Sequence, residues 1–142
     1  MATIRQFICD TCKPANAGNL FEALRKIATT RSLPCPRCGN PLRLRLKFNF
    51  GLNAKHSDCT VLAAFTPQRR EKWKDENGNP VEYYPFLVFL KRHGRETAVW
   101  LPYWHLVTTK KRVIRKYGQW APFMDMHLFR NIMRQARQRG IR

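Results

Sequence analysis

Residues 35–50 read CPRCGNPLRLRLKFNF, and from Leu42 onward this stretch alternates strictly between apolar and polar residues. The apolar positions are Leu42, Leu44, Leu46, Phe48 and Phe50. A period of two places these side chains on one face of a strand, so the stretch predicts a half-buried β-strand. The other face carries Arg43, Arg45 and Lys47, which gives an exposed row of three positive charges.

Two cysteine pairs, Cys9 with Cys12 and Cys35 with Cys38, are separated by 22 residues. Each CxxC turn directs two sulfur atoms at one metal ion, and tetrahedral Zn²⁺ takes two such turns. In a reducing compartment this spacing predicts a four-thiolate zinc site. Two disulfides or a redox-active pair are the alternatives. The N-terminus lacks the apolar segment of a signal peptide, and no βαβ pattern surrounds either pair.

The second pair lies in residues 33–42, LPCPRCGNPL, where Gly39 follows the second cysteine and a strand comes next. This segment resembles the zinc knuckle of zinc-ribbon proteins. The resemblance covers about the first 45 residues, so we expect a zinc-ribbon module over 1–45 and a basic α+β domain packed against it over 46–142. It implies a structural Zn²⁺ ion and no particular activity, because zinc ribbons serve nucleic-acid binding, protein contacts and scaffolding alike. The fifth cysteine, Cys59, lies in an apolar run and is expected in the core.

A helix is expected between the two cysteine pairs, over residues 20–30. Asn19 suits the N-cap position, and Glu22 follows three residues later, as in a capping box. Phe21, Leu24 and Ile27 recur with helical spacing and predict one buried side.

The rest of the chain predicts further strands and two helices. Strands are expected at 59–65, 81–90 and 97–101, with a hairpin between the last two and a long polar loop over 67–80. Helical spacing predicts a helix over 102–117, although Thr108 and Thr109 would also suit a strand. A last helix is expected to begin with Asp125 as its cap and to end at Gly140. Its expected buried side holds Leu128, Phe129, Ile132, Met133 and Ala136.

The predicted fold class is therefore α+β. It combines an N-terminal four-cysteine zinc ribbon carrying an inserted helix, an antiparallel sheet of about four strands, and two C-terminal basic amphipathic helices.

The chain has a large excess of positive charge. Its 142 residues include 27 Lys and Arg against nine Asp and Glu, a net charge of +18 at pH 7, and residues 100–142 hold +9 of it. Self-repulsion opposes folding unless such charge is solvated or meets an external polyanion. Seventeen of the basic residues are Arg, whose planar guanidinium group can donate two hydrogen bonds to one phosphate. No apolar run approaches the ~20 residues of a membrane-spanning helix. These properties favour a nucleic-acid-binding protein of the cytoplasm or, in a eukaryote, the nucleus.

We expect Lys and Arg to contact the phosphate backbone of RNA or DNA, as in a subunit of a ribonucleoprotein or nucleic-acid-processing complex. Exposed tryptophans, at Trp73, Trp104 or Trp120, would add base stacking. No Rossmann, Walker or nucleophile-elbow pattern indicates a small-molecule substrate. The predicted contact residues are spread over several elements: Arg43, Arg45, Lys47, Arg69, Arg70, Trp73, Arg92, Arg95, Lys111, Arg112, Arg115, Lys116, Arg130, Arg134 and Arg137.

Two other classes of function stay open. A metal-dependent nuclease needs converging carboxylates, for which Asp58, Glu82 and Glu96 are the candidates, and their spacing matches no recognisable nuclease core. His56 beside Asp58 is a poor substitute for one. A protein-interaction module, either an adaptor or an inhibitor, would instead attach its basic surface to an acidic protein or to the nucleic-acid channel of a partner. We expect a binding protein rather than an enzyme.

Overall fold

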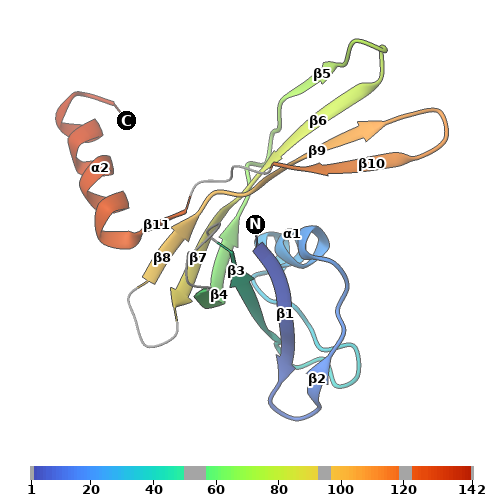
Figure 1. Ribbon diagram of the computed structural model, residues 1–142, viewed down its shortest axis with the longest axis vertical. Helices are drawn as coiled ribbons and strands as arrows, with labels where there is room; N and C mark the ends of the chain where they lie inside the picture. The colour runs from blue at the N-terminus through green and yellow to red at the C-terminus, as the bar shows by residue number, and fades with distance from the viewer. Residues whose placement is uncertain (1, 50–56, 93–96, 119–122, 142) are drawn as a thin grey trace.

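The computed structural model describes residues 2–49, 57–92, 97–118 and 123–141, apart from the side chains of Ser57, Asp125 and Leu128. Within these residues the chain is mainly β, with two antiparallel sheets and two helices (Figure 1). In chain order the elements are β1 (Ala2–Cys9), β2 (Lys13–Ala15), α1 (Leu20–Thr30), β3 (Arg43–Phe48), β4 (Ser57–Phe65), β5 (Lys72–Lys74), β6 (Pro80–Pro85), β7 (Leu87–Arg92), β8 (Thr97–Trp100), β9 (Tyr103–Thr108), β10 (Val113–Tyr117), β11 (Phe123–Asp125) and α2 (Met126–Gln138).

The larger sheet has seven strands in the order β11-β8-β7-β4-β3-β1-β2. Its strand β3 is the one predicted from the alternating sequence, and it pairs with β1 and β4. Leu44, Leu46 and Phe48 are buried in the core, while Arg43 and Lys47 are exposed. The period of two therefore correctly separated the buried face of β3 from its charged face.

Helix α1 was also predicted correctly. The side chain of Asn19 accepts a hydrogen bond from the backbone N–H of Glu22 at 2.9 Å, which satisfies one of the free N–H groups at the helix start. Phe21, Leu24 and Ile27 are buried in the same core as the strands of the larger sheet. Packing of this apolar side fixes the helix between the two cysteine pairs.

The smaller sheet has four strands in the order β10-β9-β6-β5 and extends away from the larger sheet (Figure 1). The two sheets share one long, bent hairpin: β6 continues into β7 and β8 into β9, while β7 pairs with β8 and β6 with β9. At the bend the backbone N–H of Phe86 donates to the carbonyl of Pro102 at 2.8 Å. Proline lacks an N–H, so Pro85 and Pro102 interrupt the ladder where the chain passes from one sheet to the other.

An aromatic cluster holds the bend against α1. The ring centroid of Phe21 lies 5.0 Å from that of Tyr84, 6.1 Å from Phe86 and 5.4 Å from Trp104, in edge-to-face arrangements. All four side chains are buried. The two sheets and the helix thus meet in one continuous core.

The predicted fold class is wrong. Residues 102–117 form the hairpin β9–β10 instead of a helix, so the described C-terminal residues hold one helix and not two. Residues 81–90 are divided between β6 and β7 in different sheets, and the expected polar loop contains β5, which pairs with β6. The apolar spacing in 102–117 fits both periods, and the β-branched residues Val107, Thr108, Val113 and Ile114 favour strands. The proposed division of the chain at residue 45 stays a prediction.

Helix α2 lies where a helix was expected, but its apolar side is not buried. Ile132 is 53% exposed and Met133 is 41% exposed, because among the described elements the helix makes its main contacts with β8 and β11, at one edge of the larger sheet. Gly140, at φ 78°, follows the end of the helix as predicted. The side chain of the expected cap, Asp125, lies outside the described residues. Neither helix in the described part of the chain is long and apolar enough to cross a membrane.

Candidate metal centre and basic surfaces

The four paired cysteines come together in space. Their Sγ atoms all lie within 4.8 Å of one another, and those of Cys9 and Cys38 are 3.5 Å apart. Tetrahedral Zn²⁺ with sulfur ligands at about 2.3 Å places neighbouring sulfurs roughly 3.8 Å apart. The cluster therefore has the size needed to hold one metal ion.

Two turns aim these cysteines at a common point. Cys9 is the last residue of β1, and the backbone N–H of Cys12 points to its sulfur at 3.4 Å. In the second turn, the N–H of Gly39 donates to the carbonyl of Cys35 at 2.9 Å, and Gly39 has φ 76°. That positive φ is readily adopted only by glycine, which explains the residue that follows the second pair.

Backbone N–H groups prepare one thiol to act as a ligand. The N–H groups of Cys38 and then Arg37 donate to the Cys35 sulfur and lower the pKa of this thiol to about 7. In contrast, the contact with the Cys38 side chain, together with burial, raises the pKa of Cys12 to about 12. Thiolates are the form that binds a metal, so a bound cation would replace these protons and relieve the crowding of the sulfurs.

The alternative of two disulfides is not found. All five cysteines are among the described residues, and none forms a disulfide. Cys59 is fully buried in the core, as expected. Among the described residues, the four paired cysteines form the only group of three or more side chains suited to hold a metal.

The two candidate nuclease carboxylates that the structure describes do not belong to such a group. Asp58 and Glu82 lie on β4 and β6, in different sheets. Each carboxylate forms an ion pair with an arginine, Asp58 with Arg5 and Glu82 with Arg70. Glu96 and His56 lie outside the described residues.

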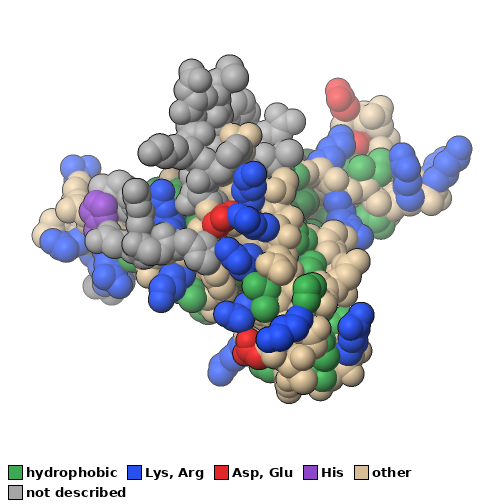
Figure 2. Space-filling view, turned by 60° about the horizontal axis from the view of Figure 1, so that its bottom comes forward, with side chains coloured by type: hydrophobic (Ala, Val, Ile, Leu, Met, Phe, Trp, Pro, Cys, Tyr) green, Lys and Arg blue, Asp and Glu red, His purple; other side chains and the backbone are tan. Residues whose placement is uncertain are grey.

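Three predicted contact residues lie on the solvent face of β3, namely Arg43, Arg45 and Lys47. The register pairs Arg45 with Thr60 of β4, and Thr60 with Lys91 of β7, so Lys91 extends the same face. Arg43 forms an ion pair with the exposed Asp10 at 2.8 Å. Figure 2 shows one side of the protein, on which Lys and Arg side chains are numerous and acidic side chains are few.

The basic residues of the helix expected over 102–117 are instead distributed along a hairpin. Lys111 and Arg112 lie in the turn between β9 and β10. Arg115 and Lys116 are adjacent on β10 and therefore point to opposite faces of the smaller sheet. Arg115 forms an ion pair with Glu22 of α1 at 3.5 Å, so it links the hairpin to the helix.

Arg70 and Arg92 pack against aromatic rings. The Arg70 guanidinium lies 4.1 Å from the ring centroid of Tyr84 and also pairs with Glu82 at 2.5 Å, which gives it a structural role. Arg92 lies 5.6 Å from the ring of Phe123. Arg69 is exposed in the segment between β4 and β5. Arg95 lies outside the described residues.

A row of arginines follows α2. Arg130, Arg134 and Arg137 are exposed, and together with Phe89, Met126, Phe129 and Met133 they line a hollow of about 490 Å³ between the helix and the larger sheet. Residues 126–142 contain no Asp or Glu. Within the described part of the chain, none of the three arginines forms an ion pair.

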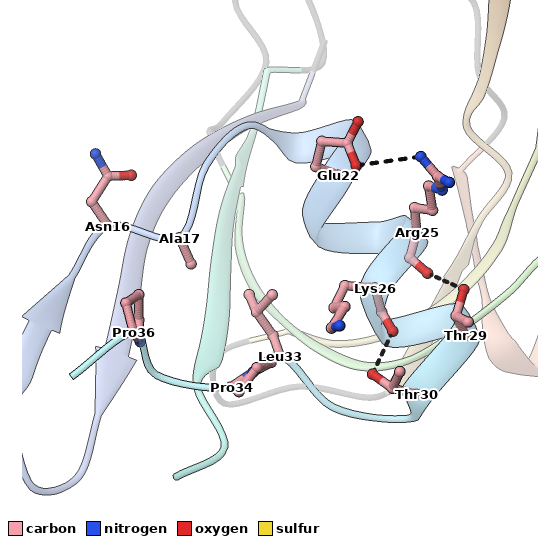
Figure 3. A pocket seen from close by; sticks show the side chains of 10 residues that line it. All are labelled: Asn16, Ala17, Glu22, Arg25, Lys26, Thr29, Thr30, Leu33, Pro34 and Pro36. Atoms are coloured by element: carbon pink, nitrogen blue, oxygen red, sulfur yellow. Dashed lines mark hydrogen bonds and ion pairs between the residues drawn. The ribbon is translucent and has the colours of Figure 1, made fainter. Parts of the chain in front are cut away.

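Sequence reasoning missed the basic side of α1. Arg25 and Lys26 line a hollow of about 730 Å³ between α1 and the second cysteine turn (Figure 3). Arg25 turns toward Glu22, with which it forms an ion pair at 3.7 Å. The hydroxyls of Thr29 and Thr30 donate to carbonyls of the preceding helical turn and are thus engaged. The exposed positions of the predicted helix could have indicated these two cations.

The three candidate tryptophans differ. Trp104 is buried in the aromatic cluster at the bend, Trp73 is 43% exposed on β5, and Trp120 lies outside the described residues. Three other rings near Trp73 were missed, namely Tyr83, Tyr103 and His105. Tyr103 and His105 alternate as they would on one face of a strand. The prediction of a helix over 102–117 did not take this signal into account.

Comparison with known proteins adds no family to this description. The chain matches no protein-family model, and no curated protein or solved structure is significantly similar to it.

Proposed function

We propose that this chain is a nucleic-acid-binding protein whose N-terminal part is stabilised by a structural Zn²⁺ ion bound to Cys9, Cys12, Cys35 and Cys38. Lys and Arg on several elements contact the phosphate backbone. The protein acts as a subunit of a ribonucleoprotein or nucleic-acid-processing complex rather than as an enzyme.

The observation that carries this proposal is the arginine row of α2. Arg130, Arg134 and Arg137 lie within two turns of one helix whose segment has no acidic residue. Like charges at this spacing repel one another, so the row destabilises an isolated helix. A phosphate backbone offers regularly spaced negative charges that would remove this repulsion.

The metal part of the proposal rests on the donor set. Four cysteine sulfurs within 4.8 Å of one another suit Zn²⁺, which is common in structural sites of this kind. Zinc would join β1 to the segment that leads into β3, and both strands belong to the larger sheet. Inductively coupled plasma mass spectrometry of the purified protein tests this assignment, since one zinc per chain is expected.

Salt-dependent binding tests the nucleic-acid part. The nuclease-treated protein is titrated into labelled RNA and DNA, single- and double-stranded, at several salt concentrations, with fluorescence anisotropy as the readout. The logarithm of affinity should fall with the logarithm of salt by about 0.7–0.9 for each phosphate that is neutralised. Weak, salt-independent binding to all four probes would refute the proposal.

A charge-matched pair of variants locates the contact. Replacing Arg130, Arg134 and Arg137 by Gln should reduce the salt slope by about 2–3 units. The control replaces Arg25, Lys26 and Arg37 by Gln, which removes the same charge from exposed positions elsewhere. Equal effects of the two triple variants would mean that binding follows the total charge and not the α2 row.

One observation favours a second candidate, attachment to another protein through α2. Ile132 and Met133 expose apolar surface that packing within the described part of this chain leaves uncovered. An apolar contact persists at high salt, whereas phosphate contacts are lost. A partner retained in high salt, about 1 M, by the wild type but not by Ile132→Glu would favour this candidate.

A further inference from the structure

The outward face of the smaller sheet carries a continuous row of aromatic rings. The register pairs Tyr83 of β6 with His105 of β9, and Val81 of β6 with Trp73 of β5, so alternation places Trp73, Tyr83, Tyr103 and His105 on the same face. The centroids of Trp73 and His105 are 5.4 Å apart. Those of Tyr83, Tyr103 and His105 are 5.6 Å from one another. We call these four residues the aromatic strip.

The strip is separate from the hydrophobic core. The core side of the same sheet holds Tyr84, Trp104 and Tyr117, which pack toward α1. Among the described elements, β5, β6, β9 and β10 make extensive contacts only with one another. None of the other described helices and strands therefore covers the strip. Trp73 is 43% exposed and the other three rings are half-buried.

Three side chains of the strip have polar atoms with no hydrogen-bond partner among the described residues. In the described part of the chain, no hydrogen bond joins another residue to the Tyr83 hydroxyl, the Tyr103 hydroxyl or the His105 ring; their contacts are with other rings. These groups are therefore available to an external ligand.

The backbone opposite Tyr103 makes room for its ring. Gly118 donates its N–H to the carbonyl of Tyr103 at 2.9 Å, in continuation of the β9–β10 ladder. A Cβ atom at Gly118 would lie only 2.1 Å from the ring of Tyr103. The absence of a side chain at this position is thus what permits the ring to lie where it does.

Positive charge borders the strip. Lys116 of β10 is paired in register with His105 and shares its face. The turn that joins β9 and β10 adds three exposed cationic residues next to this strand: Lys110, Lys111 and Arg112. Rings beside cations form the combination that binds unpaired bases and their phosphates.

We propose that the aromatic strip is a binding site for single-stranded nucleic acid, in which bases stack on the four rings and phosphates lie along Lys116 and the adjoining basic turn. This inference rests on the proposed nucleic-acid-binding function and specifies its substrate. A duplex does not fit the strip, because its base faces are stacked inside the helix and only their edges are accessible.

Binding of labelled oligouridylate and oligothymidylate of about 15 nucleotides tests the site, with a mixed-sequence duplex as comparison. Trp73→Leu and Tyr103→Leu keep the charge of the protein, so they should weaken single-strand binding by about 5- to 100-fold while leaving the salt slope and duplex binding unchanged. Phe65→Leu is the control, because Phe65 is a 55% exposed ring on the larger sheet. Circular dichroism and thermal melting show whether each variant is folded.

Tryptophan fluorescence provides a second readout that needs no folding comparison. Saturating oligothymidylate should quench the emission of the wild type, and Trp73→Phe, which keeps a ring at this position, should lose most of the quenching while it still binds. If no nucleic acid binds at all, the proposed function fails. If single strands bind but the strip variants and the quenching behave like the control, the function stands and the strip is refuted. Loss of binding to a proline-rich peptide, with single-strand binding intact, would assign the strip to a peptide instead.

Discussion

Replacing Gly118 by Ala perturbs the structure at one defined contact. The new methyl group would lie 2.1 Å from one ring atom of Tyr103 and 2.4 Å from two others, whereas ordinary contact begins near 3.4 Å. The ring must therefore move by more than about 1 Å against the neighbouring rings of Tyr83 and His105, which costs about 1–3 kcal/mol. Displacement of Tyr103 also disturbs its contacts with the rings of Tyr83 and His105.

Thermal and urea unfolding measure this cost. We expect Gly118→Ala to lower the free energy of unfolding by about 2 kcal/mol, which corresponds to a decrease of roughly 4–10 °C in Tm for a chain of this size. A double-mutant cycle isolates the contact. In a Tyr103→Ala background the same substitution should cost much less, with a coupling energy of about 1–2 kcal/mol. Equal costs in both backgrounds would refute the role assigned to the Tyr103 ring.

Four further outcomes are expected. Cys35→Ser should lose the metal and destabilise the N-terminal part, because metal binding energy adds to folding energy in such sites, whereas Cys59→Ser should keep the metal; metal analysis and melting curves check both. Folding lowers the pKa of Cys35 from 9.0 to about 7, so the stabilisation that this thiolate provides to the metal-free protein is fully present above pH 9 and is lost as the pH falls through 7. Urea unfolding of chelator-treated protein across this range should show that loss, and Cys35→Ala should remove the part of the pH dependence that Cys35 contributes. Phe21→Ala should destabilise the protein by about 3–5 kcal/mol through the cavity it leaves at the bend, and a urea midpoint close to that of the wild type would contradict the packing described. Asn19→Ala should cost about 1 kcal/mol by removing the cap of α1, with the exposed Lys26→Ala as the neutral control in the same urea measurements.

The sequence by itself determined the local features. Strict alternation specified β3 and its charged face, because the strand is the regular secondary structure in which side chains repeat with a period of two. The N-cap Asn19 and the spacing of Phe21, Leu24 and Ile27 specified α1, since both signals lie within one short segment. The two CxxC pairs specified which four side chains meet, because each pair shares one tight turn and a cluster of four sulfurs needs two such turns. The net charge of +18 is likewise a property of composition alone.

Only the tertiary structure decided how the remaining segments pair. Whether residues 102–117 form a helix or two strands depended on β6, about 20 residues away, which supplies the ladder for β9. The division of residues 81–90 between two sheets depended on contacts of Phe86 and Tyr84 with Phe21, on a distant helix. The aromatic strip follows from the same pairing, because it joins side chains of β5, β6 and β9. Such features depend on contacts between segments that are far apart in the chain. The free energy of those contacts cannot be inferred from a local sequence pattern.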